Sequence, residues 1–243
     1  MTKARVVLGA LLIAATAAGC RTDWASASRD SAGLAPLPAE AREAIVHVYA
    51  ARAFSWRGTF AVHSWIAVKE ADADAYEVID VTGWRVRRGA GRAVRVREEV
   101  PDREWFGATP TLLQELRGEE AAAAIPKLRA AVEAYPYPSS YRMFPGPNSN
   151  TFVSHVLRRV PELTVELPPH AIGKDWLEGG GVVDTTESGT GGQLNLLGLL
   201  GVQLGLAEGV ELNLLGLCFG VDLWSPAVKL PFIGRVGFPD RGL

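Results

Sequence analysis

Cysteine and histidine are scarce in this chain of 243 residues, which contains two cysteines and four histidines. No group of them has the spacing of a zinc site, so we expect no metal and no other cofactor. A charge excess is also missing, because 25 Lys and Arg face 27 Asp and Glu, and nucleic acid is therefore not an expected partner. What the chain does have is 48% hydrophobic residues, enough for one sizeable core in a single domain.

The N-terminal apolar run, from Val6 to Ala17, is too short to span a bilayer as a stable helix. It follows the basic residues Lys3 and Arg5 and leads into Ala17-Ala18-Gly19-Cys20, which resembles the lipobox of bacterial lipoproteins. This resemblance implies a signal peptide over residues 1–19 and a Cys20 that carries acyl chains, palmitate included, as the first mature residue. An ordinary secretory signal with an unmodified Cys20 is the alternative.

A lipidated Cys20 has consequences for the rest of the chain. It anchors the protein to a membrane of the bacterial cell envelope, facing the periplasm, and leaves Cys218 without a partner for an intramolecular disulfide. Residue 21 is Arg and not Asp, so by resemblance to lipoprotein sorting signals the sequence contains no signal for retention at the inner membrane. This favours the outer membrane. Residues 20–38 then form a tether. Residues 39–243 form a single α+β domain, with a core over about 56–177 and a β extension over about 185–237.

Two stretches rich in β-branched and aromatic residues, Thr59 to Lys69 and Tyr76 to Thr82, predict an antiparallel hairpin. The second strand brings an acid beside His63 on the first, and this acid is either Asp80 or Glu77. The two acids point to opposite faces, so only one of them can serve His63. A histidine on such a strand is either a packed sheet residue or a catalytic base.

Helical spacing of apolar residues predicts three helices before residue 136, over Glu40 to Ala53, from Pro110 to Gly118, and over Glu119 to Tyr135. Pro126 lies inside the third helix and is expected to kink or split it. Between the first two, Trp84 to Arg97 carries six arginines. This stretch is either a hairpin whose solvated arginine face pairs with the acids that follow, or a basic patch for phosphate-bearing lipid headgroups or glycolipids.

A rigid loop that becomes a helix, Pro145 to Arg159, is the most informative stretch of the chain. Its prolines exclude regular structure up to Pro147, and apolar residues then recur at steps of three and four. Asn148 or Ser149 would be the N-cap, where backbone N–H groups lack partners and the helix end is positive. That position suits a nucleophile and also an ordinary cap.

Glycine and leucine dominate the C-terminal part. The segment Leu194 to Leu199 recurs as Leu212 to Leu217, and glycine at this density argues against helices. We expect twisted strands buried on both faces, with the repeat marking two strands of one hairpin. A membrane role is the bolder interpretation of so apolar a segment, but Glu208, Glu211 and Asp222 argue against insertion.

Several motifs together resemble a bacterial family known as domain of unknown function 3750 (DUF3750). The resemblance runs from about Trp56 to Gly237, and the family name implies no activity. The motifs are TFAVHSWIAVK, Gly83-Trp84, PDREWFG, Tyr135-Pro136-Tyr137, PGPNSNTFVSHVLRRVPEL, LPPHAIGKD and the Gly/Leu tail.

A strand histidine followed by a helix start of the Asn-Cys-x-x-Phe type also resembles circularly permuted NlpC-type, papain-like hydrolases, such as the lecithin-retinol acyltransferase-like group. This likeness implies an α+β fold in which an antiparallel sheet packs on helices, with a permuted papain-like core and the Gly/Leu-rich β hairpins as an extension. It implies His63 as the base, Ser149 as the nucleophile in place of the cysteine, and Asp80 (or Glu77) as the residue that orients the imidazole. Serine is the weaker acid and needs a tightly placed base and a ready oxyanion hole.

Three functions remain open at this stage. The sequence favours an envelope lipoprotein whose papain-like groove binds a cell-wall peptide, glycan or lipid without turnover. The alternatives are an amidase, esterase or acyltransferase that uses Ser149 and His63, with His170 and Asp175 as a fallback base and acid, and a purely structural lipoprotein. The oligomeric state is left open. The groove residues would be Trp65, Tyr137, Tyr141, Asn148 and Asn150.

Overall fold

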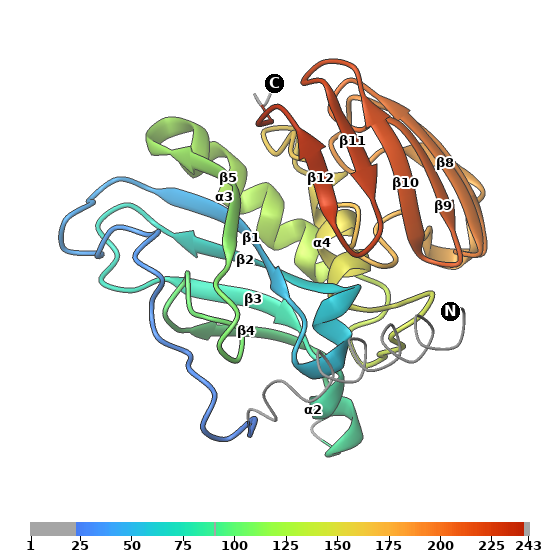
Figure 1. Cartoon of the computed structure of the whole chain (residues 1–243). Helices are drawn as coiled ribbons and strands as arrows, with labels where there is room; N and C mark the ends of the chain where they lie inside the picture. The colour runs from blue at the N-terminus through green and yellow to red at the C-terminus, as the bar shows by residue number, and fades with distance from the viewer. Residues whose placement is uncertain (1–22, 90, 241–243) are drawn as a thin grey trace, which may run out of the picture.

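The computed structural model describes residues 23–89 and 91–240, which form an α+β fold with two antiparallel sheets (Figure 1). The first sheet has five strands in the order β4-β3-β2-β1-β5, and the second has seven in the order β12-β11-β10-β9-β8-β7-β6. Helix α4 (Ser149–Leu157) lies between the two sheets (Figure 1). The expected signal peptide over residues 1–19 and the acylated Cys20 lie outside the described residues, as does Ala90.

The first sheet contains the expected hairpin but also two strands that we expected to be helices. Its strands are β1 (Ile45–Arg52), β2 (Val62–Lys69), β3 (Glu77–Val81), β4 (Val94–Glu98) and β5 (Thr111–Arg117). The antiparallel pairing of β2 with β3 confirms the hairpin. The helices expected over residues 40–53 and from Pro110 were wrong, because these segments form β1 and β5. Strand β1 pairs with both β2 and β5 and is buried on both faces, so its residues form an apolar run without clear strand alternation.

The helices are short except for α3 (Gly118–Glu133), which confirms the third expected helix. Pro126 lies inside α3 without splitting it. The arginine-rich stretch begins with α2 (Gly83–Arg87) and not with a strand, so the hairpin expected there was wrong in its first half. Two 3₁₀ turns, η1 (Ser55–Thr59) and η2 (Glu178–Gly180), complete the helical elements of the described residues.

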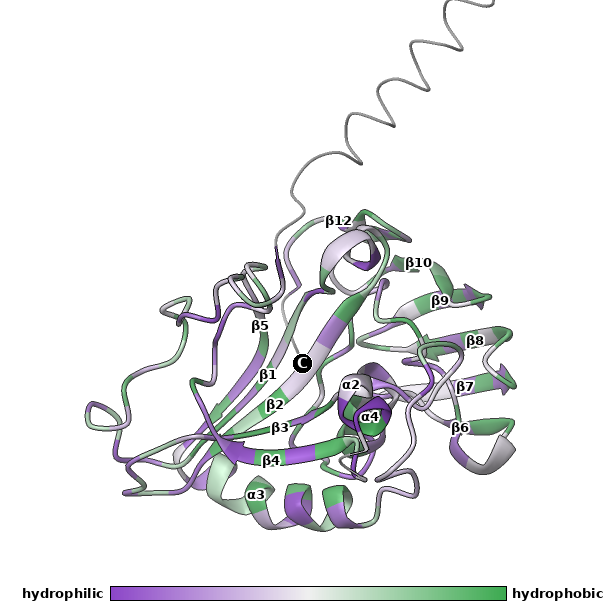
Figure 2. Cartoon of the chain, turned by 90° about the horizontal axis from the view of Figure 1, so that it is seen from below, coloured by the Kyte–Doolittle hydropathy of each residue, from purple (hydrophilic) through white to green (hydrophobic). Residues whose placement is uncertain are grey.

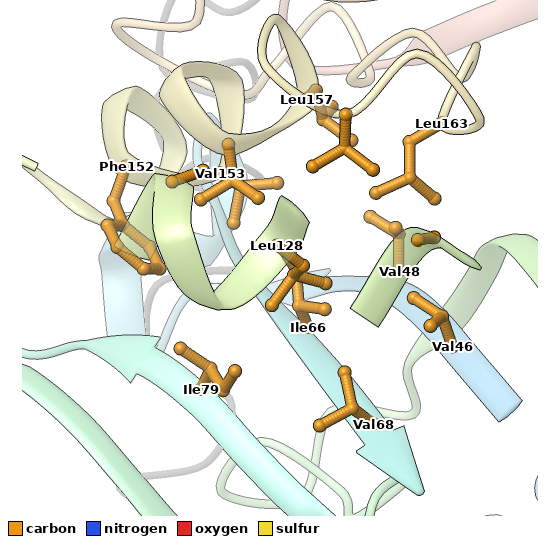
Figure 3. Packing of buried hydrophobic residues seen from close by; sticks show 14 of the residues in the cluster. Val46, Val48, Ile66, Val68, Ile79, Leu128, Phe152, Val153, Leu157 and Leu163 are labelled. Atoms are coloured by element: carbon orange, nitrogen blue, oxygen red, sulfur yellow. The ribbon is translucent and has the colours of Figure 1, made fainter. Parts of the chain in front are cut away.

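The main hydrophobic core lies between the first sheet and the helices that cover one of its faces. Leu128 of α3 packs with Ile66 of β2, and Phe152 and Val153 of α4 join the same cluster (Figure 3). All four side chains are fully buried, and each contributes about 1.5 to 3 kcal/mol by leaving water. The periodic apolar face of the Pro145–Arg159 stretch is therefore what fixes α4 against β2.

A capping box closes the first turn of α4. Oδ1 of Asn148 accepts hydrogen bonds from the N–H groups of Asn150 (2.9 Å) and Thr151 (3.0 Å), and Oγ1 of Thr151 accepts one from the N–H of Asn148 (2.7 Å). Nδ2 of Asn148 also donates to the carbonyl oxygens of Met143 (3.0 Å) and Ile172 (3.1 Å). One side chain thus ties the helix start to the proline loop before it and to the segment after it.

Asn148→Ala is expected to lower the free energy of unfolding by about 2 to 4 kcal/mol, because it removes the cap and two further hydrogen bonds. Urea denaturation followed by circular dichroism measures the loss. Ser149→Ala is the matched control, since the Ser149 hydroxyl forms no hydrogen bond with the described residues, and it should cost under about 1 kcal/mol. Equal losses in both variants would contradict the capping role of Asn148.

The second sheet shows what the leucine-rich repeat encodes. Its strands are β6 (Val183–Thr185), β7 (Gly191–Leu196), β8 (Leu200–Gly205), β9 (Gly209–Leu214), β10 (Leu217–Asp222), β11 (Ala227–Leu230) and β12 (Gly234–Gly237). Each repeat supplies a hairpin turn, Leu197-Gly198 or Leu215-Gly216, and all four residues have positive φ. The repeat therefore marks two successive hairpins, and the expectation of one hairpin was wrong. A Cβ on Gly198 would lie 2.4 Å from Cβ of Pro145, so this turn packs on the loop before α4.

The second sheet is polar on its inner face and apolar on its outer face, so the expected burial on both faces was also wrong. On β9, Glu211 and Asn213 are buried, whereas Val210, Leu212 and Leu214 are exposed. The same alternation of hydrophobic and hydrophilic residues is visible along the neighbouring strands (Figure 2). The inner face therefore has to satisfy polar and charged groups away from water.

Buried ion pairs satisfy the charges of the inner face. Glu211 bridges two lysines, with Oε2 2.7 Å from Nζ of Lys174 and Oε1 2.9 Å from Nζ of Lys229. Oε1 of Glu187 lies 3.3 Å from Nζ of Lys174, and Lys229 also contacts Glu166. Burial alone would raise the pKa of Glu211, but the two lysines outweigh it and hold this pKa below its ordinary value. Glu211 is thus the shared counter-ion of both lysines.

Candidate functional site

The structure brings His63 and Asp80 together on one face of the first sheet. Nε2 of His63 lies 3.7 Å from Oδ2 of Asp80, which is an ion-pair distance and too long for a hydrogen bond. Glu77 points to the opposite face, where its Oε2 lies 2.7 Å from Nη2 of Arg129 in α3. Asp80 is therefore the acid that lies beside the histidine.

Ser149 does not reach this histidine. The residue that faces α4 from β2 is Ser64, whose Oγ donates to Oδ1 of Asn150 at 2.9 Å and lies 3.4 Å from the carbonyl oxygen of Ser149. Successive residues of a strand point to opposite faces, so His63 points away from α4, and its ring stacks on Trp105 with centroids 3.6 Å apart. The expected pair of Ser149 and His63 is therefore not assembled, because the alternation of β2 places Ser64 opposite the helix start.

Two of the expected groove residues hold the fold together. Trp65 is fully buried and donates from Nε1 to the carbonyl oxygen of Pro101 at 2.8 Å. Asn150 donates from Nδ2 to the carbonyl oxygen of Val62 at 3.2 Å, which links α4 to the start of β2. Like Asn148, both side chains donate hydrogen bonds to backbone carbonyl groups.

The two expected tyrosines pack beside α4 and α2. The hydroxyl of Tyr137 accepts a hydrogen bond from the N–H of Gly179 at 2.9 Å. The ring of Tyr141 lies so close to Gly83 that a Cβ there would come within 2.4 Å of it. The proline- and tyrosine-rich loop thus packs against its neighbours, which is one of the two roles that its sequence left open.

The fallback base and acid, His170 and Asp175, lie in different environments. Burial lowers the pKa of His170 to about 4, with help from the charges of Arg52 and Lys174. Oδ2 of Asp175 accepts a hydrogen bond from Nδ2 of Asn195 at 2.6 Å. No hydrogen bond or ion pair joins His170 to Asp175 among the residues that the structure describes.

A pocket of about 410 Å³ opens next to Asp80, and two arginines that donate hydrogen bonds to Asp80, Arg95 and Arg103, line it. Its walls combine aromatic rings with guanidinium groups, and two glutamates complete the lining. The rings belong to Trp24, Phe54, Trp84, Trp105 and Phe106. The arginines are Arg29, Arg57, Arg88, Arg95, Arg97 and Arg103, and we call this site the arginine pocket. Its volume falls within the usual range for ligand sites.

Asp80 organises two of these arginines from behind the wall. Its Oδ1 accepts a hydrogen bond from Nε of Arg95 at 2.6 Å, and its Oδ2 accepts one from Nη2 of Arg103 at 3.0 Å. Burial alone would raise the pKa of Asp80, but His63 and Arg95 outweigh it and hold this pKa far below its ordinary value. Burial also lowers the pKa of His63, against the opposing charge of Asp80, so the imidazole is neutral at neutral pH.

Other guanidinium groups of the arginine pocket have no such partner. Arg29, Arg57 and Arg88 form no ion pair with any residue in the described part of the chain. The Arg103 side chain is only 2% exposed, and its Nη1 is buried without a hydrogen-bond acceptor among the described residues. The guanidinium groups of Arg29, Arg57 and Arg88 line the pocket and present donors that an anionic ligand can satisfy.

Positive charge is in excess around the pocket. The six arginines face three carboxylates, Glu99, Glu104 and Asp80, which leaves three positive charges unbalanced. Guanidinium groups bind phosphate and carboxylate through paired hydrogen bonds, and the aromatic walls suit an apolar portion of the same ligand. The arrangement is therefore chemically suited to an anion that carries an apolar group.

The side chains that line the pocket carry no hydroxyl, thiol or amine, and the carboxylates among them are those of Glu99 and Glu104. Over residues 23–89 and 91–240, no group of three or more His, Cys, Asp or Glu could hold a metal ion. In the same residues, no helix is both long and apolar enough to cross a membrane.

Sequence reasoning found the arginine-rich stretch but not the pocket that it helps to form. Trp24 comes from the segment expected to be a tether, which instead packs on the domain. There, Oδ2 of Asp102 accepts a hydrogen bond from the N–H of Leu34 at 2.6 Å, and the hydroxyl of Ser31 donates to the same carboxylate at 2.9 Å. The available signal was the density of tryptophan, phenylalanine and arginine between residues 84 and 106.

The fold and the site together define an α+β protein with an arginine-lined, aromatic pocket. The chain belongs to the family described as protein of unknown function DUF3750, whose model matches residues 43–176. This match runs from β1 through α4 and ends before the second sheet. No curated protein and no solved structure matches the chain.

Proposed function

We propose that this chain is a non-catalytic binding protein of the bacterial cell envelope, held at a membrane by a lipidated Cys20. Its arginine pocket binds a ligand that combines a phosphate or carboxylate with an apolar part, as envelope lipids, glycans and peptides can provide. The observation that carries the proposal is a pocket lined by six arginines and two glutamates, in which Arg29, Arg57 and Arg88 form no ion pair with any described residue. The lipobox resemblance around Cys20 supports the anchor.

A permuted papain-like core is part of this proposal, because α4 begins at Ser149 and packs on β2 of an antiparallel sheet. The hydrolase and acyltransferase alternatives need a base beside the Ser149 hydroxyl. The side chain that faces the helix start is Ser64, and a serine hydroxyl is not a base. A purely structural lipoprotein would give the unpaired arginines no partner, so binding without turnover has the stronger support.

Titration of the full-length protein with phenyl phosphate tests the pocket, with benzyl alcohol as the uncharged analogue. Isothermal calorimetry should show binding of the phosphate and none of the alcohol. Arg57→Gln or Arg88→Gln is expected to weaken phenyl phosphate binding about ten- to hundredfold, since each removes a charge-assisted hydrogen bond. Higher salt should weaken binding further.

The matched control is Arg42→Gln, which changes an exposed arginine whose Nε lies 3.0 Å from Oδ1 of Asp72. Arg42 does not line the pocket, so this variant should bind phenyl phosphate as the wild type does. Equal affinity for phosphate and alcohol, or equal losses in Arg42→Gln and the pocket variants, would overturn the proposed function.

A further inference from the structure

The outer face of the second sheet is a continuous apolar surface. Cross-strand neighbours on it include Leu194 with Val202, Val202 with Leu212, and Leu212 with Phe219. A second row runs across β9 to β12 through Val210, Val221, Val228 and Val236. Seven strands about 4.8 Å apart and about 20 Å long span on the order of 600 Å², as much apolar surface as soluble monomers leave exposed. We call this surface the outer sheet face.

In the part of the chain that the structure describes, no strand of the second sheet places a charged side chain on the outer sheet face. The three acids that argue against membrane contact in the sequence, Glu208, Glu211 and Asp222, are all buried. Glu211 faces the lysines of the inner face, and Oδ2 of Asp222 lies 2.7 Å from Nη1 of Arg235. Strand alternation thus places charged groups on the inner face, at a cost in desolvation, and leaves apolar side chains on the outer face, with the exposed Thr185 of β6 as a polar exception. The objection to a membrane role therefore does not apply to the folded sheet.

The apolar character continues past the strands into the turns. At one end of the sheet, the turns expose Leu197 and Leu215, and at the other end they expose Leu206, Leu223 and Trp224. Interfaces between soluble proteins usually have an apolar centre and a polar rim. An apolar edge fits a surrounding medium that is itself apolar, and this favours lipid over a second copy of the chain.

Residues 6–17, the apolar run outside the described part, are too few to cover this face. Even as a helix they would measure about 18 Å by 10 Å, which is about a third of the area. The occupant must therefore be larger.

The outer sheet face is joined to the arginine pocket by aromatic rings in edge-to-face contact. Phe232, in the turn between β11 and β12, lies 6.2 Å from the ring of Phe60, and Phe60 lies 5.4 Å from the ring of Trp56. The guanidinium of Arg57, which lines the pocket, lies 5.9 Å from the Trp56 ring. Apolar surface and positive charge thus adjoin, as they do on proteins that lie on anionic bilayers.

We propose that the outer sheet face lies on the surface of an anionic phospholipid bilayer, with its leucine, valine and phenylalanine side chains among the acyl chains. The arginine pocket at its border takes a phosphate headgroup, and this part alone rests on the proposed function. The backbone groups inside the sheet are paired between strands, so the sheet needs no further partner when it leaves water.

Depth-dependent quenching tests the contact in the full-length chain. In a Cys20→Ser background, Cys218 is the one remaining native thiol of the two in the sequence. Burial raises the pKa of the Cys218 thiol and keeps it from reacting with the dye. Leu212→Cys and Val228→Cys then place a polarity-sensitive dye on the outer sheet face, and Glu120→Cys places it on the exposed side of α3. With phosphatidylglycerol vesicles, brominated lipids should quench the dye at 212 and 228 and leave the dye at 120 unchanged.

Two results would overturn the inference. One is the absence of quenching at 212 and 228 while the chain still sediments with vesicles through its N-terminal segment. The other is a blue-shifted dye at 212 without lipid together with a doubled mass in light scattering, which would assign the face to a second copy. Leu212→Glu should abolish quenching at 228, whereas Leu37→Glu, a matched change at an exposed leucine outside the sheet, should preserve it.

The role of the pocket is tested separately. Arg57→Gln should remove the preference for phosphatidylglycerol over phosphatidylcholine vesicles and retain quenching on the outer sheet face. If wild type binds no phenyl phosphate but the face is still quenched, the proposed pocket function fails and the membrane contact stands. If the pocket binds phenyl phosphate but the face is not quenched, the membrane contact fails alone.

Discussion

Asp80→Asn is expected to lower the free energy of unfolding by about 3 to 5 kcal/mol. The carboxylate is fully buried and accepts hydrogen bonds from Arg95 and Arg103, whose side chains are themselves mostly buried. An asparagine has nearly the same shape, so the variant removes the charge without opening a cavity. It removes the buried counter-ion of Arg95 and one of the two carboxylate partners of Arg103, whose Nε also lies 3.1 Å from Oε2 of Glu99. The burial of charge that is then no longer compensated is what destabilises the fold.

Glu77→Gln is the matched control for this change. It lies on the same strand, and its partner is also an arginine, Arg129, at 2.7 Å. Both side chains of that pair are more than a third exposed, so the loss should stay under about 1 kcal/mol. Chemical denaturation of the two variants measures both effects. If the two substitutions cost the same, burial is not what gives the Asp80 pair its importance.

The Asp80 effect should also depend on pH, in a direction that its lowered pKa fixes. Because the pKa is lower in the folded chain than in the unfolded chain, where it is about 4, folding is favoured when the carboxylate is ionised. This contribution is complete above about pH 4 to 5 and is lost as the pH falls toward the folded pKa. The stability difference between wild type and Asp80→Asn should therefore stay constant above about pH 5 and shrink as the pH falls from about 5 to about 3. A difference that stays constant from about pH 5 to about pH 3 would contradict the lowered pKa.

The sequence predicted elements well where the residue types or the spacing of apolar residues favoured one kind of structure over the other. Strands β2 and β3, helix α3 and the start of α4 at Asn148 all follow from such patterns. Strand β1 was missed, although the equally buried β2 was predicted, because the spacing of Ile45 and Val48 suits a helix as well as a strand. Which faces of a strand are buried depends on the elements that pack against it, and the sequence of the strand alone does not reveal them.

The C-terminal sheet shows a pattern that was present in the sequence but was interpreted differently. Asn195, Gln203, Glu211 and Asn213 alternate with leucine and valine, which is the signature of a strand with one polar face. In most soluble proteins the polar face points outward, and here it points inward. Which face turns inward depends on the buried lysine that the sheet meets, Lys174, and this residue is far away in the sequence.

The candidate site depended on partners that are distant along the chain. Strand pairing was enough to place Asp80 near His63, since both belong to one hairpin. The nucleophile could not be placed in the same way, because a single step along β2 decides whether His63 or Ser64 faces α4. The pocket joins Trp24 to Arg103 across most of the first sheet, and no local pattern connects them.

Glu211→Gln is expected to be at least as damaging as Asp80→Asn, with a loss of about 3 to 5 kcal/mol or more. Glu211 is the shared counter-ion of Lys174 and Lys229, and none of the three side chains is more than 1% exposed. The amide keeps the shape but removes the charge, so both ammonium groups lose most of their compensation at once. Glu187 and Glu166 remain as weaker substitutes. Denaturation in guanidinium chloride, followed by tryptophan fluorescence, measures the loss.

A double-variant cycle separates the charge effect from simple loss of packing. Lys229→Met alone also breaks the cluster, but Glu211→Gln combined with Lys229→Met removes one charge of each sign and leaves the remaining charges balanced as before. The pair should therefore cost clearly less than the sum of the two single changes, by about 1 to 3 kcal/mol, as expected for groups in direct contact. Additive losses would mean that the lysine and the glutamate are held independently, and that the inner face is polar for a reason other than this network. A recovery would show that balanced charge among these side chains is what stabilises the inner face of the sheet.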